Sequence, residues 1–255
     1  MTARPTLVPP PPLRPLTLGE LLDVSFGLYR SMFVPLLVVA ATVHALPTLL
    51  GVYLETSEQM FSLWPLTLVN LFLAVVLSSL GVAATTHIVS EAYLGRRIRA
   101  GEALGRAVPL MGKLIVISVL TWLLVSIGLM LLIVPGVILL SGLLLSSVAM
   151  VVESPRRATT AMARSWELTL GYRGKVFGTV LLAFLLLIVP IAAVEAIWGA
   201  VAPPSPSALV PQVLTAVLQV MVYPYVYTVV TLLYYDLRIR KEGFDLELLA
   251  GAAEP

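Results

Sequence analysis

The stretch that decides the fold is ESPRRATTAMARSWELTLG, residues 153–171, which lies between two long apolar runs. Ser154 is a typical N-cap, Pro155 suits the first position of a helix, and Gly171 suits its end. Between these signals apolar residues recur at helical spacing on one face, and charged and hydroxyl side chains occupy the other. The pattern predicts a basic amphipathic helix over 155–170 that lies on a membrane surface or packs beneath a bundle of spans.

The composition excludes a water-soluble globule. The chain has 255 residues, of which 59% are hydrophobic and 12% charged, and its mean hydropathy is +0.98. Soluble domains carry about 45–50% apolar and about 25% charged residues. The net charge of +2 gives no reason to expect a nucleic-acid partner. The absence of cysteine excludes disulfides, thiolate metal sites and cysteine nucleophiles.

Six apolar runs are long enough to cross a bilayer, which needs roughly 20 residues. They lie at about 34–54, 63–91, 114–133, 136–152, 175–201 and 208–235. A short amphipathic helix is expected before each pair of spans, at 17–32, 100–112 and 155–170. Val134, Pro135 and Gly136 predict a tight turn between the third and fourth spans. We therefore expect an all-α polytopic membrane protein.

The domain organisation follows from these runs. One membrane domain covers 17–242. The segment 1–16 is rich in proline and predicts an extended, disordered tail. A second tail is expected over 243–255.

The basic residues predict the orientation. All 16 lysines and arginines fall in alternate connectors: before the first span, between the second and third, between the fourth and fifth, and after the sixth. The other three connectors contain none. Because lysine and arginine are retained on the cytoplasmic side, both termini are expected in the cytoplasm.

Three stretches carry a family resemblance: LTLGELLD at 16–23, VES at 152–154 followed by ARSWELTLG at 163–171, and YDLRIRKEGFDLE at 235–247. Together they resemble the membrane-domain family of glycerophosphoryl diester phosphodiesterases. The resemblance implies a multi-pass protein of the bacterial cytoplasmic membrane. Some members carry a catalytic barrel after the membrane part, but neither the barrel nor its histidine-led motif is found here, so we expect no phosphodiesterase activity.

Four polar residues stand in the middle or outer half of the expected spans: His44, Asn70, Glu195 and Gln219. They could converge into an outward-facing polar pocket, where metal binding or proton transfer is conceivable. Alternatively, each could bond locally to neighbouring helices. The sequence alone favours the local interpretation, and it predicts neither a metal site nor a cofactor.

The sequence leaves three functional hypotheses. The first is a non-catalytic module that engages membrane lipids or a protein partner through a basic cytoplasmic face formed by Arg156, Arg157 and Arg164. The second is a small transporter or channel that uses the four polar residues. The third, a lipid-modifying enzyme, requires a catalytic motif that the sequence does not offer, so we expect no enzymatic activity.

Overall fold

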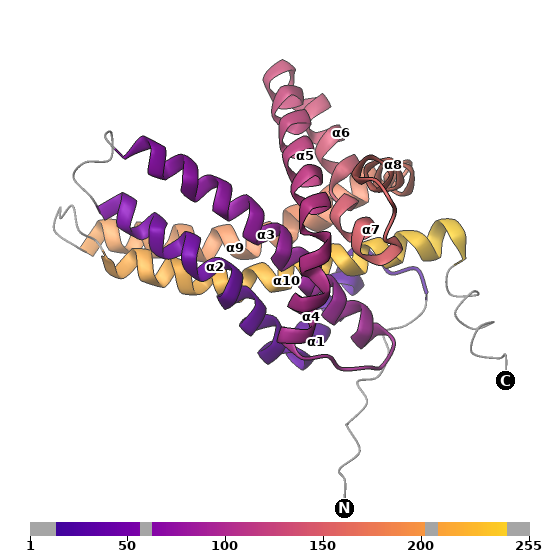
Figure 1. The fold of residues 1–255 in the computed structure, drawn as a ribbon, viewed down its shortest axis with the longest axis horizontal. Helices are drawn as coiled ribbons and strands as arrows, with labels where there is room; N and C mark the ends of the chain where they lie inside the picture. The colour runs from indigo at the N-terminus through magenta and orange to yellow at the C-terminus, as the bar shows by residue number, and fades with distance from the viewer. Residues whose placement is uncertain (1–13, 57–62, 202–208, 244–255) are drawn as a thin grey trace, which may run out of the picture.

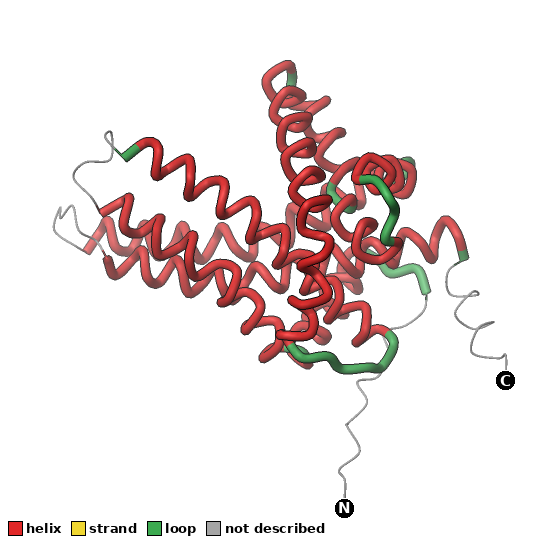
Figure 2. The backbone as a smooth tube through the Cα atoms, in the orientation of Figure 1, coloured by secondary structure: helices red, strands yellow, loops and turns green. Residues whose placement is uncertain are grey.

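The computed structural model describes residues 14–56, 63–201 and 209–243, and in these ranges every regular element is a helix (Figure 2). Six helical stretches are long and apolar enough to cross a membrane, which confirms the all-α, six-span prediction. The tails predicted for 1–16 and 243–255 lie almost wholly outside the described residues. The elements are α1 (Leu18–Ser31), α2 (Phe33–Thr56), α3 (Trp64–Tyr93), α4 (Ala100–Ala107), the 3₁₀ turn η1 (Val108–Leu110), α5 (Met111–Leu131), α6 (Ile133–Leu143), α7 (Ser146–Glu153), α8 (Ala158–Thr169), α9 (Arg173–Val201) and α10 (Leu209–Glu242).

A short helix precedes each pair of spans, as the sequence predicts: α1 before α2 and α3, α4 before α5 and α6, and α8 before α9 and α10. The first of them begins at a capping box. The Glu20 backbone N–H donates to Thr17 Oγ1 (3.4 Å), and the Thr17 N–H donates to Glu20 Oε2 (2.8 Å). Such a reciprocal pair satisfies donors that the first turn of a helix leaves free.

The spans form two arms on a common base (Figure 1). Helices α2, α3, α9 and α10 pack together in one arm, and the α5–α6 hairpin extends in a different direction. The base is formed by α1, α4, α7 and α8 against the ends of the spans. We call this end the basic side, because the connectors that carry the lysines and arginines meet there.

The turn between α5 and α6 lies earlier than predicted. Leu132, with extended backbone angles (φ −162°, ψ 150°), separates the two helices, and Pro135 lies in the first turn of α6 rather than in the turn itself. A proline is tolerated there because the first-turn N–H groups have no partner within the helix. Gly136 lets the helices approach closely: a Cβ atom at this position would lie 2.8 Å from the backbone nitrogen of Leu129.

The fourth span, predicted as one helix over 136–152, is broken between α6 and α7. Ser165 of α8 explains the break. Its Oγ donates to the Gly142 carbonyl (2.7 Å) and accepts from the Leu145 N–H (3.1 Å), so a side chain replaces part of the helical hydrogen-bond ladder. The Trp166 ring packs on Gly142, where a Cβ would lie 2.4 Å from Cε3.

The predicted start of the surface helix over 155–170 was wrong. Ser154 ends α7 in a left-handed conformation (φ 47°, ψ 45°), and α8 begins only at Ala158, with Arg157 as an N-cap that makes no side-chain bond. The physical reason is that Ser154 caps the end of α7 instead of the start of α8. Pro155 then stands just after a helix, where proline is common because it cannot continue that helix. The predicted end was correct: Gly171 follows α8 with φ +87°.

The tightest packing lies at the basic side, where Tyr234, Leu237 and Ile88 are fully buried. At its centre is Asp236 of α10, whose side chain is 1% exposed. Its carboxylate accepts from the Leu16 N–H (2.7 Å), Lys175 Nζ (2.5 Å) and Arg240 Nε (2.9 Å). Both cations also donate to the Leu16 carbonyl, at 2.7 and 2.6 Å. This Asp236 node joins the segment before α1 to α9 and α10.

Candidate functional site

A cavity of about 350 Å³ lies inside the four-helix arm, away from the basic side. Its position follows from the chain: the lining residues come from the last half of α2, the first half of α3, the last part of α9 and the first half of α10. Close packing is concentrated in the opposite halves of these helices; in α3 the buried residues begin only at Ser79. The lining residues are His44, Pro47, Thr48, Gly51, Val52, Asn70, Ala74, Glu195, Gln212, Thr215, Ala216, Gln219 and Tyr223.

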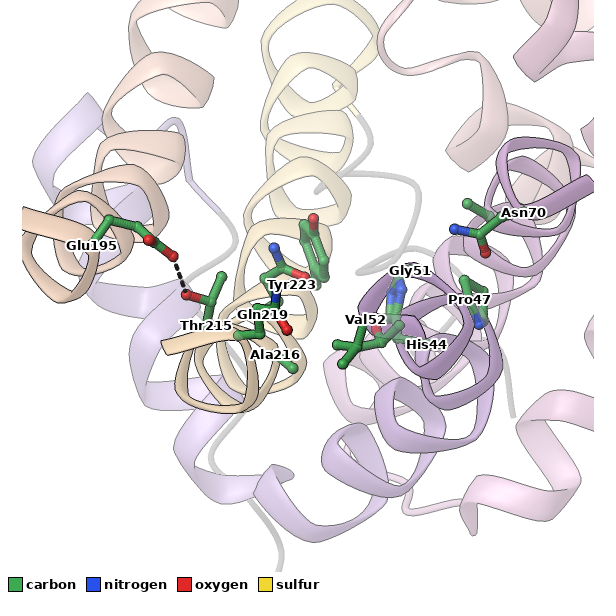
Figure 3. A pocket seen from close by; sticks show the side chains of 13 residues that line it. His44, Pro47, Gly51, Val52, Asn70, Glu195, Thr215, Ala216, Gln219 and Tyr223 are labelled. Atoms are coloured by element: carbon green, nitrogen blue, oxygen red, sulfur yellow. Dashed lines mark hydrogen bonds between the residues drawn. The ribbon is translucent and has the colours of Figure 1, made fainter. Parts of the chain in front are cut away.

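Two helix faces supply most of the wall. On α2, lining residues recur at the spacing i, i+3, i+4 and i+7, starting at His44. On α10 the same spacing starts at Gln212 and continues to Tyr223. Because residues three and four apart share one side of a helix, each helix presents one continuous face to the cavity, and this face is more polar on α10 than on α2. Figure 3 shows the α10 residues between Glu195 of α9 on one side and the α2 and α3 residues on the other.

All four polar residues singled out in the sequence line this cavity. Glu195 Oε1 accepts a hydrogen bond from Thr215 Oγ1 (3.2 Å; Figure 3). The His44 ring stacks on Tyr223, with centroids 4.7 Å apart. The structure therefore brings His44, Asn70, Glu195 and Gln219 to one place.

Several polar atoms of the wall have no hydrogen-bond partner among the described residues: His44 Nε2, Asn70 Oδ1 and Gln212 Oε1. A buried polar atom without a partner costs about 1–3 kcal/mol. Local bonding to neighbouring helices, which the sequence favoured, accounts for Glu195 but not for these three atoms. A solute or ordered water in the cavity would satisfy them.

Sequence reasoning missed four polar residues of the wall: Thr48 on α2, and Gln212, Thr215 and Tyr223 on α10. A signal for the three on α10 was present, because they lie seven and four residues before and four residues after Gln219. The spacing on α10 would have placed these three and Gln219 on one helix face.

The cavity is closed toward the basic side. Tyr227 stacks on Tyr223 at 6.2 Å, and below it Thr86 and Thr231 share a buried hydroxyl–hydroxyl contact of 3.3 Å. In the described ranges, no group of three or more histidine, aspartate or glutamate side chains is placed to hold a metal ion. Among the described residues, the site is thus a pocket with a closed floor and one lining carboxylate, Glu195.

The three arginines expected to form one basic face do not act alike. Arg156 and Arg157 are exposed in the connector between α7 and α8. Arg164 instead forms ion pairs with Glu153 (2.7 Å) and Glu242 (2.5 Å), and its side chain is only 24% exposed. The Glu242 carboxylate, followed by Glu153, raises the pKa of the Arg164 guanidinium. Arg164 therefore links α7, α8 and α10, and of the three only Arg156 and Arg157 are exposed.

Comparison with known proteins places the chain. A family model described as "Uncharacterised protein family (UPF0259)" matches residues 47–232, which is more than half of the chain. The chain belongs to this family. The match begins at Pro47 in α2 and ends at Leu232 in α10. Of the residues that line the cavity, only His44 lies outside the matched region.

One UPF0259 relative is a membrane protein of Photorhabdus laumondii subsp. laumondii. It is 33% identical over 113 residues, and the match covers 44% of this chain and 44% of the relative's length. No solved structure matches the chain.

The resemblance to the glycerophosphoryl diester phosphodiesterase membrane domains was wrong, because the family that matches is UPF0259. The structure gives a physical reason for the error. The stretches that carried the resemblance hold structural residues: Ser165 and Trp166 dock α8 on the broken fourth span, and Asp236 joins α10 to the segment before α1. Packing and charge demands of this kind arise in many membrane proteins, so short stretches that meet them do not identify a family.

Proposed function

We propose that this protein binds a small organic cation in the cavity of the four-helix arm and acts as a small transporter. The observation that carries the proposal is a cavity that combines one carboxylate, Glu195, with three unpartnered polar atoms. Its volume of about 350 Å³ falls in the range of small-molecule sites, about 300–1,000 Å³.

The lining chemistry selects the charge of the solute. Glu195 is the one charged residue in the described wall, and the carbonyl oxygens of Asn70 and Gln212 are further acceptors. A solute that carries a positive charge and N–H donors would satisfy these groups, whereas an anion would face the Glu195 carboxylate.

Orientation and mechanism complete the proposal. If the basic side faces the cytoplasm of a bacterial cell, the cavity lies in the outer half of the membrane. Its closed floor supports an outward-facing binding state of a transporter rather than an open pore. No catalytic step is part of the proposal.

A ligand-stability experiment tests the solute class. Purified protein in mild detergent is heated with butylammonium or with butyrate, which match in size and differ in charge. A ligand at 100 times its Kd stabilises a protein by about 2.7 kcal/mol. Butylammonium should raise the unfolding temperature and butyrate should not, and Glu195→Gln should weaken butylammonium binding roughly 10- to 100-fold, as expected for one hydrogen bond to a charged group.

The matched control is Glu102→Gln, which removes the same charge from an exposed residue of α4. Equal stabilisation by both ions, or unchanged butylammonium binding in Glu195→Gln, would contradict the proposal.

A second experiment asks whether the cavity holds water. Because the chain has no cysteine, single cysteines can be placed at Gln219, which lines the cavity, and at Val217, which is 52% exposed on the outer surface of the same helix. A charged maleimide reacts with a thiolate in water and not with a thiol in lipid. We expect labelling at position 219 and little at 217; the reverse order would refute a water-accessible cavity.

A further inference from the structure

The second feature lies at the other end of the molecule and is independent of the cavity. A pocket of about 470 Å³ opens where α1 meets α2, beside the connector from α3 to α4. Three arginines line it: Arg30 from the last turn of α1, and Arg97 and Arg99 from the connector. The rest of the wall is mainly apolar and includes Phe33, Val34, Pro35, Val38 and Ile98.

These three arginines differ from most other cations of the chain. In the described ranges, the remaining lysines and arginines, apart from Arg156 and Arg157, form an ion pair, donate to a backbone carbonyl or lie over an aromatic ring. For Arg30, Arg97 and Arg99 no such partner is found there. Three cationic side chains around one pocket repel one another unless an anion lies between them.

The apolar wall indicates where that anion comes from. Val34 and Val38 lie one helical turn apart on α2, at the start of a membrane span, and they are 69% and 47% exposed. Exposed valines one turn apart beside a basic pocket suit an acyl chain that runs along α2 below a headgroup. A soluble phosphate would make no contact with this apolar surface.

We infer that this pocket is a binding site for an anionic phospholipid. The phosphate lies among Arg30, Arg97 and Arg99, where guanidinium groups can donate paired hydrogen bonds to its oxygens. One acyl chain follows Val34 and Val38 along α2. The site holds a lipid at the junction of the surface helix α1, the span α2 and the α3–α4 connector.

The test compares two double variants of the full-length protein that lose the same charge. Arg97→Gln/Arg99→Gln removes two arginines from the pocket, and Arg156→Gln/Arg157→Gln removes two exposed arginines elsewhere on the basic side. The probe is dioctanoyl phosphatidylglycerol added to protein in neutral detergent, with dioctanoyl phosphatidylcholine as the uncharged comparison. Retained lipid is counted by native mass spectrometry.

Each basic residue at a membrane surface contributes about fivefold in lipid affinity. We therefore expect the pocket variant to bind phosphatidylglycerol roughly thirtyfold more weakly and the control variant to bind it as the unaltered protein does. Arg97→Lys/Arg99→Lys should restore much of the binding, because lysine keeps the charge and loses only the paired hydrogen bonds. Equal losses in both double variants, or equal binding of the two lipids, would overturn the inference.

Two further measurements separate a lipid from a free phosphate and binding from folding. Val34→Asn should weaken phosphatidylglycerol binding, and millimolar inorganic phosphate should compete poorly. Effective competition by inorganic phosphate, with no effect of Val34→Asn, would show that the pocket takes a soluble anion and would overturn the lipid assignment. The pocket variants should unfold within a degree or two of the unaltered protein, since none of the three arginines has a partner among the described residues to lose.

Discussion

Replacing Asp236 by alanine should destabilise the protein more than any change to an exposed ion pair. The substitution removes three hydrogen bonds to one carboxylate that is 1% exposed. It also leaves the Leu16 N–H without its acceptor and removes the counter-charge of Lys175 and Arg240. Removing one partner of a buried ion pair costs about 3–5 kcal/mol.

The structure favours the lower end of that range. Lys175 and Arg240 are 17% and 23% exposed, and both keep their bonds to the Leu16 carbonyl, so water and backbone solvate part of the freed charge. We expect a loss of about 3 kcal/mol in the free energy of unfolding. For a chain of this length that corresponds to roughly 6–12 °C in unfolding temperature. The loss for Asp236→Asn should lie between zero and the loss for Asp236→Ala, because asparagine keeps an acceptor for the Leu16 N–H but carries no charge.

Thermal unfolding in mild detergent, followed by size-exclusion chromatography, measures the loss. The matched control is Glu102→Gln, since the Glu102–Arg106 pair joins side chains that are 49% and 42% exposed and pairs of this kind contribute about 0.3–0.5 kcal/mol. Hydrogen exchange at the Leu16 amide gives a local readout and should quicken only in the Asp236 variants. An Asp236→Ala protein that unfolds at the same temperature as the control would refute this account of the node.

Two further predictions concern packing and orientation. Gly142→Ala should lower the free energy of unfolding by about 1–3 kcal/mol, because its Cβ would lie 2.4 Å from the Trp166 ring. The control Gly112→Ala, whose Cβ would have no atom within 4 Å, should be neutral or slightly stabilising. Thermal unfolding compares the two variants, and equal effects would argue against close packing of α6 on α8. In intact cells a membrane-impermeant maleimide should label a cysteine at Ser57 and spare one at Thr159; labelling at 159 would reverse the proposed orientation.

The spans could be predicted because each is a local property of its own stretch of sequence. Apolar length alone located all six, and the Thr17–Glu20 capping box placed the start of α1 within its own four residues. The largest error came where a distant residue decides the local structure. The break in the fourth span depends on Ser165, some twenty residues later. No residue within 136–152 predicts this break.

The same distinction between local and long-range determinants applies to the cavity and to the Asp236 node. The polar residues of the cavity were visible one at a time, but their convergence depends on how α2, α3, α9 and α10 pack. The bond from the Leu16 N–H to Asp236 joins residues 220 positions apart. Neither composition nor periodicity can predict such a contact. In the sequence, Asp236 is indistinguishable from the other charged residues that follow the sixth span.

The two arms have a consequence for the surrounding bilayer. The α5–α6 hairpin leaves the base in a different direction from the other spans (Figure 1), and its tip exposes Met130, Leu131, Leu132 and Ile133. In a bilayer these apolar side chains would lie against acyl chains on more than one side. The outer part of the hairpin would then be held by lipid rather than by the neighbouring spans, so its surroundings depend on the membrane more than those of the four-helix arm do.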